Sequence, residues 1–249
     1  METKILIIGG SSFLAQNYIN FDKKNKLTCL VRNKKNLIKK KNVSYINSNI
    51  ISKKLLKKII LEYKINTILN FVSNNNNSLD KDLDNYKIFS DNVITSLKIL
   101  EIIKFLNIKY ICFDSFERKK NKNSAYILAK KVISDVNNFY EDKYNIKIIS
   151  VVLPTVIGKF DTNKNRIIPF LSENNKLKKP NYTIVFAFAE DIVNSIKNNI
   201  ENNKKIKFKI YKKKASFFLN RFLDIRKLKR KSFFLSKINE IFSYYKKNR

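Results

Sequence analysis

Three side chains within the segment DSFERKKNKNSAYILAKK, residues 114–131, have the chemistry needed for proton transfer. Tyr126 and Lys130 are four residues apart, so a helix through this segment places them on one face. An ammonium beside a phenol stabilises the phenolate, and we therefore expect Lys130 to lower the pKa of Tyr126 into a range useful for catalysis. Ser115 stands at the end of a predicted strand, where its hydroxyl could bond the same substrate oxygen. Because the chain has no histidine, acid–base chemistry falls to tyrosine, lysine and carboxyl groups.

A second group of residues could bind phosphate. The opening KILIIGGSSFLAQ, residues 4–16, is a short apolar run that ends in two glycines and leads into a predicted helix. Dinucleotide-binding turns use three glycines, for the tight turn, for approach to the pyrophosphate and for close helix packing. Here Ser12 takes the place of the second, and its hydroxyl could donate to a phosphate oxygen at a helix N-terminus that favours anions. The predicted phosphate turn comprises Gly9, Gly10, Ser12, Phe13 and Leu14.

The end of the second predicted strand bears on the choice of cofactor. Arg32 stands where an NAD-selective fold presents an acidic residue to the ribose hydroxyls. A guanidinium suits the 2′-phosphate of NADP, to which it makes planar, charge-assisted contacts. The alternative is that Arg32 is one more basic residue in a lysine-rich chain. Position favours the first interpretation, so we expect NADP (NADPH), with NAD less favoured.

Apolar strand-like runs alternate with longer amphipathic stretches along the chain, which predicts an α/β fold. The predicted strands are 4–9, 26–32, 43–47, 66–72, 109–114 and 147–153. Helical spacing of apolar residues marks 52–63 and 84–107. Strands apolar on both faces and joined by helices indicate a Rossmann-like, doubly wound parallel sheet with helices on both faces. We predict this core over 1–153 and a small, reduced substrate-binding region over 154–249, where 154–171 reads as a loop and short helix.

Composition limits the classes of function. The formal net charge of +32 is spread over the whole chain together with abundant Asn and Ile, as an AT-rich coding sequence would produce, so we expect no specific nucleic-acid partner. The rival, a basic nucleic-acid-binding protein, would show steeply salt-dependent affinity. With two cysteines, Cys29 and Cys112, and no histidine, we expect no metal site. Apolar runs are too short for a membrane span or a signal peptide, which predicts a cytoplasmic protein.

In their order along the chain, these motifs resemble those of the extended short-chain dehydrogenase/reductase family, the NAD(P)-dependent nucleotide-sugar epimerases, dehydratases and reductases. GGSSFLA is similar to the family's GGxGFLG opening, YILAK to YxxSK, and VVLPTVIG to LRPxxVYG. DNVITSLKILE and FAFAEDIVNSI match two family helices. The resemblance implies that Tyr126 and Lys130 are the active-site tyrosine and lysine and that Ser115 is their serine partner. The further cofactor contacts that we predict are Asn49, Phe71, Val72, Asn92, Lys130 and Pro154.

A closer likeness within the family is to the synthases of CDP-linked 3,6-dideoxyhexoses such as abequose, carried by the short DSF-to-YIxxK spacing, Arg32 and NKNRIIPFL. It implies an NADP-dependent reductase or epimerase of a nucleotide-activated 4-keto sugar in cell-surface polysaccharide (O-antigen) synthesis. In such a reductase, hydride passes to C4 while Tyr126 protonates the alkoxide, Ser115 orients the carbonyl and Lys130 contacts the nicotinamide ribose. Resemblance also implies a homodimer through the helix that carries Tyr126.

Several departures favour an alternative, a catalytically degenerate NAD(P)-binding scaffold or sensor without turnover. Ser12 replaces a glycine, Leu153 replaces the arginine of LRP, and the region after residue 158 is short for a substrate domain.

The chain from Lys204 onward is strongly basic and rich in aromatic residues. We interpret it as a final strand and helices that close the second region. The alternatives are weak docking on an anionic membrane, with Phe218, Phe222 and Ile225 on one helix face, or capture of a nucleotide-sugar diphosphate.

Overall fold

The computed structural model describes residues 3–33, 37–49, 51–74, 85–119, 124–164, 166–174, 181–223 and 233–247. Six strands form a parallel sheet in the spatial order β3-β2-β1-β4-β5-β6. They are β1 (Lys4–Ile8), β2 (Lys26–Val31), β3 (Val43–Asn47), β4 (Thr67–Asn70), β5 (Lys109–Ser115) and β6 (Ile148–Leu153). The predicted Rossmann-like α/β fold is confirmed. The strand order reverses between β1 and β4, where open α/β sheets bind their ligands.

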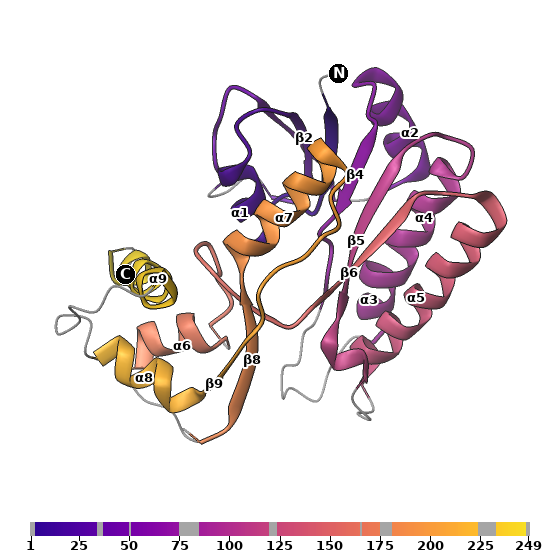
Figure 1. Cartoon of the computed structure of the whole chain (residues 1–249). Helices are drawn as coiled ribbons and strands as arrows, with labels where there is room; N and C mark the ends of the chain where they lie inside the picture. Colours follow the sequence, from indigo (N-terminus) through magenta and orange to yellow (C-terminus); the bar gives the residue numbers. More distant parts are fainter. Residues whose placement is uncertain are drawn as a thin grey trace.

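Helices cover both faces of this sheet (Figure 1). One face carries α1 (Phe13–Phe21) and α7 (Ala189–Asn202), and the other carries α2 (Lys53–Glu62), α4 (Thr95–Ile103) and α5 (Ala125–Tyr144). In β1, Ile5 and Ile7 belong to the core cluster with α1 and α7, whereas Leu6 and Ile8 belong to the cluster with the other three helices. Since successive side chains of a strand point to opposite faces, a strand buried on both sides is a continuous apolar run.

The helix predicted over 84–107 is divided into three pieces. α3 (Asn85–Phe89) leads into a π-helical turn (Ser90–Ile94), which continues as α4. The Thr95 N–H donates to the Ser90 carbonyl, five residues back. Such single π turns are frequent at functional sites. This one sets Asp91 and Asn92 at the start of α4.

The remaining residues build a second, smaller layer beside the first (Figure 1). β7 (Thr155–Ile157), β8 (Thr183–Phe188) and β9 (Tyr211–Lys214) form a three-stranded sheet in that order, with β7 parallel and β9 antiparallel to β8. β7 lies where the sequence predicted a loop. Three helices accompany this sheet: α6 (Ile167–Asn174), α8 (Ala215–Leu223) and α9 (Phe233–Lys247). Its core combines aliphatic residues with four fully buried phenylalanines, Phe186, Phe188, Phe218 and Phe242.

The basic end of the chain thus supplies a strand and two helices to this second layer. Phe218, which the membrane alternative placed on a surface, is fully buried, with its ring centroid 5.2 Å from that of Phe186. The Phe222 side chain and Ile225 lie outside the described residues. Among the helices that the structure describes, none is long and apolar enough to cross a membrane.

Candidate active site

The turn between β1 and α1 requires glycine at its first position. Gly9 has a φ of +78°, and a Cβ there would lie 3.0 Å from the Val72 backbone nitrogen. The N–H groups of Gly9 and Gly10 both donate to the Leu30 carbonyl, at 3.2 and 3.0 Å. A Cβ on Gly10 would lie 3.0 Å from that of Cys29. The turn is therefore fixed against the ends of β2 and β4.

Ser12 is the N-cap residue of α1, but its hydroxyl does not cap the helix. The Ser12 backbone is extended, and its Oγ atom is buried without a hydrogen-bond partner among the described residues. Cap hydroxyls normally accept from the first-turn N–H groups, and a buried unpaired hydroxyl requires an explanation. The first N–H groups of a helix form an anion-binding site. The unpaired Ser12 hydroxyl lies at such a site, next to a turn in which Gly9 leaves no room for a side chain. Both features suit the binding of a dinucleotide pyrophosphate.

Tyr126, Lys130 and Ser115 lie together at the carboxyl end of β5. Ser124 caps α5 by accepting from the Ile127 N–H at 3.2 Å, which places Tyr126 in the first turn of the helix. The hydroxyls of Ser115 and Ser73 lie close enough to the Tyr126 hydroxyl to lower its pKa. Lys130 follows one turn later, 4% exposed, and its Nζ donates to the Phe113 carbonyl at 2.9 Å. That Nζ lies 5.6 Å from the centroid of the Tyr126 ring.

The expected lowering of the Tyr126 pKa is not found. Burial raises this pKa above its usual value, the nearby hydroxyls of Ser73 and Ser115 oppose that effect, and the charges of Glu117 and Asp114 add to it. Burial also lowers the pKa of Lys130, against the effect of Asp114. The sequence showed the spacing of Tyr126 and Lys130 but not the loss of hydration around them, which decides the direction.

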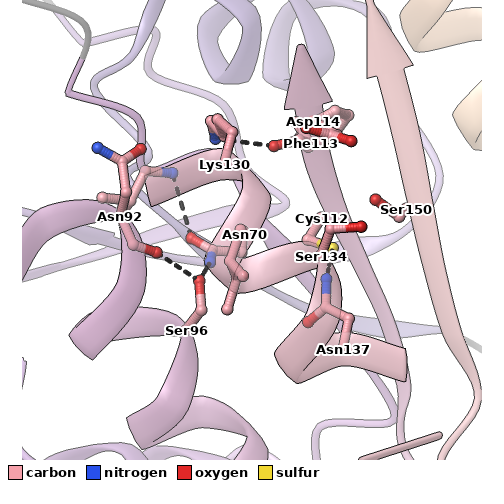
Figure 2. A pocket seen from close by; sticks show the side chains of 12 residues that line it. Asn70, Asn92, Ser96, Cys112, Phe113, Asp114, Lys130, Ser134, Asn137 and Ser150 are labelled. Carbon is pink, nitrogen blue, oxygen red and sulfur yellow. Dashed lines mark hydrogen bonds between the residues drawn. The ribbon is translucent and has the colours of Figure 1, made fainter. Parts of the chain in front are cut away.

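Lys130 and several polar side chains line a cavity of about 10 Å³ (Figure 2). The Asn70 amide donates to Ser96 Oγ at 3.3 Å. Asn92, the predicted cofactor residue of the π turn, donates to the carbonyls of Asn74 and Ile88 at 2.9 and 2.8 Å. Asn92 therefore joins the end of β4 to the start of α4. In Figure 2 its side chain lies to the side of Lys130.

The other predicted cofactor residues divide between the two halves of the sheet. Arg32 and Asn49 are exposed and follow β2 and β3, which are joined there by a 2.9 Å bond from the Ser48 N–H to the Val31 carbonyl. Phe71 follows β4 but is buried, and its ring stacks on that of Phe113 with centroids 4.6 Å apart. Val72 approaches the Gly9 turn, and Pro154 is buried after β6. Hence Arg32 and Asn49 lie where β2 and β3 end, whereas Phe71, Val72 and Pro154 lie just after β4 and β6.

Comparison with known proteins gives the family. Residues 5–210 match the model described as the NAD dependent epimerase/dehydratase family. The chain belongs to this family. The expectation of an enzyme of the extended short-chain dehydrogenase type is thereby confirmed, whereas the closer likeness to abequose synthases stays a prediction.

Solved structures of the family have the same fold. Our chain is similar to dTDP-glucose 4,6-dehydratase from Bacillus anthracis in complex with NAD, with 16% identity and a TM-score of 0.81 over 99% of this chain and 97% of that one. It is similar to UDP-glucose 4-epimerase from Thermotoga maritima with UDP-glucose, with 11% identity and a TM-score of 0.80 over 99% of both chains. A third is UDP-N-acetylglucosamine 4-epimerase from Methanobrevibacter ruminantium, with 13% identity and a TM-score of 0.81 over 100% of this chain and 99% of that one. A comparison with curated proteins finds no match.

Sequence reasoning missed two polar residues of this family site. Ser73, at the end of the predicted fourth strand, reaches the Tyr126 hydroxyl. Asp91, within the predicted helix over 84–107, reaches Arg32 with a 3.5 Å separation between its Oδ1 and the arginine Nη1. The position of Ser73 directly after a strand was a usable signal, since the carboxyl ends of parallel strands meet at one edge. The pairing of Asp91 had no local signal.

Proposed function

We propose that this protein is a cytoplasmic, NADP-dependent reductase or epimerase of a nucleotide-activated 4-keto sugar, acting in cell-surface polysaccharide synthesis. The observation that carries the proposal is the placement of Tyr126 next to Ser115, with the buried Lys130 beside the tyrosine ring and the Gly9 turn at the same edge of the sheet. On the same proposal, residues 1–153 hold the dinucleotide and 154–249 hold the sugar. Family membership supports the reaction class.

The environment of Tyr126 favours the direction of reduction. A bound nicotinamide supplies the hydride. Burial raises the pKa of Tyr126, so the phenol is protonated at neutral pH and can give its proton to an oxygen that gains negative charge. Ser115 orients the carbonyl oxygen toward that proton. Lys130, bonded to the Phe113 carbonyl, fixes the first turns of α5 against β5 and places its Nζ 5.6 Å from the centroid of the Tyr126 ring.

Several observations support the finer parts of this proposal. Arg32 is exposed at the end of β2, where its guanidinium would contact the 2′-phosphate of NADP. Similar structures were solved with UDP-glucose and with UDP-N-acetylmuramic acid, which supports a nucleotide-sugar substrate.

We extend the proposal to a homodimer through α4 and α5. Leu128 and Phe139, on α5, are each 52% exposed, and Phe105, just after α4, is 80% exposed. Together they form an apolar surface on adjacent helices, of the kind that marks a protein–protein interface.

Ser12 supports the second candidate, an NAD(P)-binding scaffold without turnover, because a side chain stands at a position that dinucleotide turns leave to glycine. The two candidates share cofactor binding and differ in chemistry. The test must therefore measure both in the same preparation.

The experiment compares wild type with Tyr126→Phe and with the control Tyr144→Phe, which removes a hydroxyl from the other end of α5. NADPH binding is followed by nicotinamide fluorescence, and turnover by loss of NADPH absorbance with a panel of 4-keto nucleotide sugars. We expect Tyr126→Phe to keep cofactor affinity and lose about 10²-fold or more in kcat, the usual contribution of a general acid. The control should keep both. Unchanged turnover in Tyr126→Phe would refute the mechanism, and wild-type binding without turnover on any sugar would favour the scaffold.

A further inference from the structure

Arg32 lies at the end of β2 and Asp91 in the π turn before α4, 59 residues later, and the two form an ion pair. The contact joins one guanidinium nitrogen to one carboxylate oxygen at 3.5 Å. It lies beside the strands that border the point of reversal between β1 and β4. A carboxylate from a different element thus stands next to the guanidinium that would contact the 2′-phosphate.

Asp91 is the more firmly held partner of this pair. Its side chain is 19% exposed, against 58% for Arg32. The other oxygen of Asp91 accepts from the Asn74 amide at 3.1 Å, and the Asn74 carbonyl accepts from Asn92. The end of β4 and the π turn therefore fix the position of the carboxylate. Arg32 is the partner with freedom to move toward a ligand.

We infer that Asp91 is a specificity-determining residue for the dinucleotide, and that the balance of Arg32 and Asp91 sets the preference for NADP over NAD. A 2′-phosphate must share Arg32 with Asp91 and is repelled by the carboxylate. A ribose that lacks the phosphate meets no such repulsion, and the carboxylate can accept a hydrogen bond from its hydroxyl. Arg32 alone would favour NADP strongly, whereas the pair keeps the preference small. This inference rests on the dinucleotide binding proposed above.

A double-mutant cycle tests the inference by binding alone. NADPH and NADH are titrated by nicotinamide fluorescence into wild type, Asp91→Asn, Arg32→Ala and the double variant. Asparagine keeps the size of Asp91 and a carbonyl that can accept from the Asn74 amide, so the substitution removes chiefly the charge. Asp142→Asn, exposed near the far end of α5, is the control for loss of one negative charge.

We expect Asp91→Asn to tighten NADPH binding by about twofold to fivefold, the scale of an exposed charge interaction, and to leave NADH binding unchanged or weaker. Arg32→Ala should weaken the binding of NADPH and leave the binding of NADH unchanged. In the Arg32→Ala background, Asp91→Asn should improve NADPH affinity less than it does in wild type, because no guanidinium is left for the carboxylate to hold. Asp142→Asn should change neither affinity.

Equal effects of Asp91→Asn on both dinucleotides, including equal loss through disturbance of the loop after β4, would overturn the inference and leave the proposed function standing. The inference would also be overturned if Asp142→Asn raised NADPH affinity as much as Asp91→Asn does. Failure of wild type to bind either dinucleotide would instead overturn the proposed function, and this inference with it.

Discussion

Replacement of Gly9 by alanine should damage the phosphate turn more than the same change at its neighbour Gly10. The two positions differ in backbone angle and in what surrounds them. Gly9 has a φ of +78°, and a Cβ there meets main-chain atoms of residues 71 and 72 at 3.0 and 3.1 Å. A Cβ on Gly10 meets side-chain carbons of Cys29 and Val31 at 3.0 and 3.1 Å, and its φ is not positive.

The expected magnitude follows from these contacts. A left-handed φ costs an L-residue about 1–2 kcal/mol. Overpacking against the fixed end of β4 adds about 1–3 kcal/mol. Alanine also reduces the conformational entropy of the unfolded chain, which offsets about 0.4–1 kcal/mol of this loss. Gly9→Ala should therefore lower the free energy of unfolding by about 1–4 kcal/mol, and Gly10→Ala, which lacks the φ cost, by about 0–2 kcal/mol.

Urea unfolding followed by circular dichroism measures both values, and NADPH titration of the folded variants measures the turn itself. We expect Gly9→Ala to weaken NADPH binding more than Gly10→Ala, because the chain must move away from Val72 at the point where the turn begins. Equal losses of stability in the two variants would refute the reasoning, because they would show that the positive φ of Gly9 carries no cost.

Three further predictions concern other parts of the molecule. Tyr18 is fully buried, and burial with the nearby Asp22 raises its pKa well above the usual value. Protonated Tyr18 contributes stability that is fully present below the unfolded pKa of about 10 and declines above it by up to about 1.4 kcal/mol per pH unit. The difference in the free energy of unfolding between wild type and Tyr18→Phe should therefore shrink between about pH 10 and 12. A constant difference would contradict the assignment. Leu128→Glu should shift the sedimentation coefficient from dimer to monomer, whereas Leu61→Glu, 61% exposed on α2, should not. Ser115→Ala should keep part of its kcat through Ser73, and Ser73→Ala/Ser115→Ala should lose more; equal values would exclude Ser73 from the reaction.

The main sheet was predictable because its strands are buried on both faces. The run 4–9 contains β1 (Lys4–Ile8), and 43–47 coincides with β3. β4 (Thr67–Asn70) is shorter than the predicted 66–72, although the Phe71 N–H still donates to the Ile8 carbonyl of β1 at 2.8 Å. β9 has the sequence YKKK, and its lysines give no apolar signal. It becomes a strand by pairing with β8 at the edge of the second sheet, where lysines are common.

Within the site, spacing along the chain predicted the features formed by residues close in sequence and failed for those that depend on distant segments. Tyr126 and Lys130 share a helix, and the turn from Gly9 to Leu14 is continuous, so both were visible in the sequence. The pKa of Tyr126 depends on burial by other segments, and its direction was therefore predicted wrongly.

The same distinction between local and distant residues applies to cofactor selectivity. The residue after the second strand is read as selecting NAD or NADP because one side chain there meets the ribose. In this chain that side chain is Arg32, and its charge is opposed by Asp91 from the start of α4. The π turn, which helical periodicity does not reveal, sets the position of Asp91, and Asn74 holds its second oxygen. A selectivity read from one strand end is thus incomplete whenever a neighbouring element brings a charge of opposite sign within ion-pair distance.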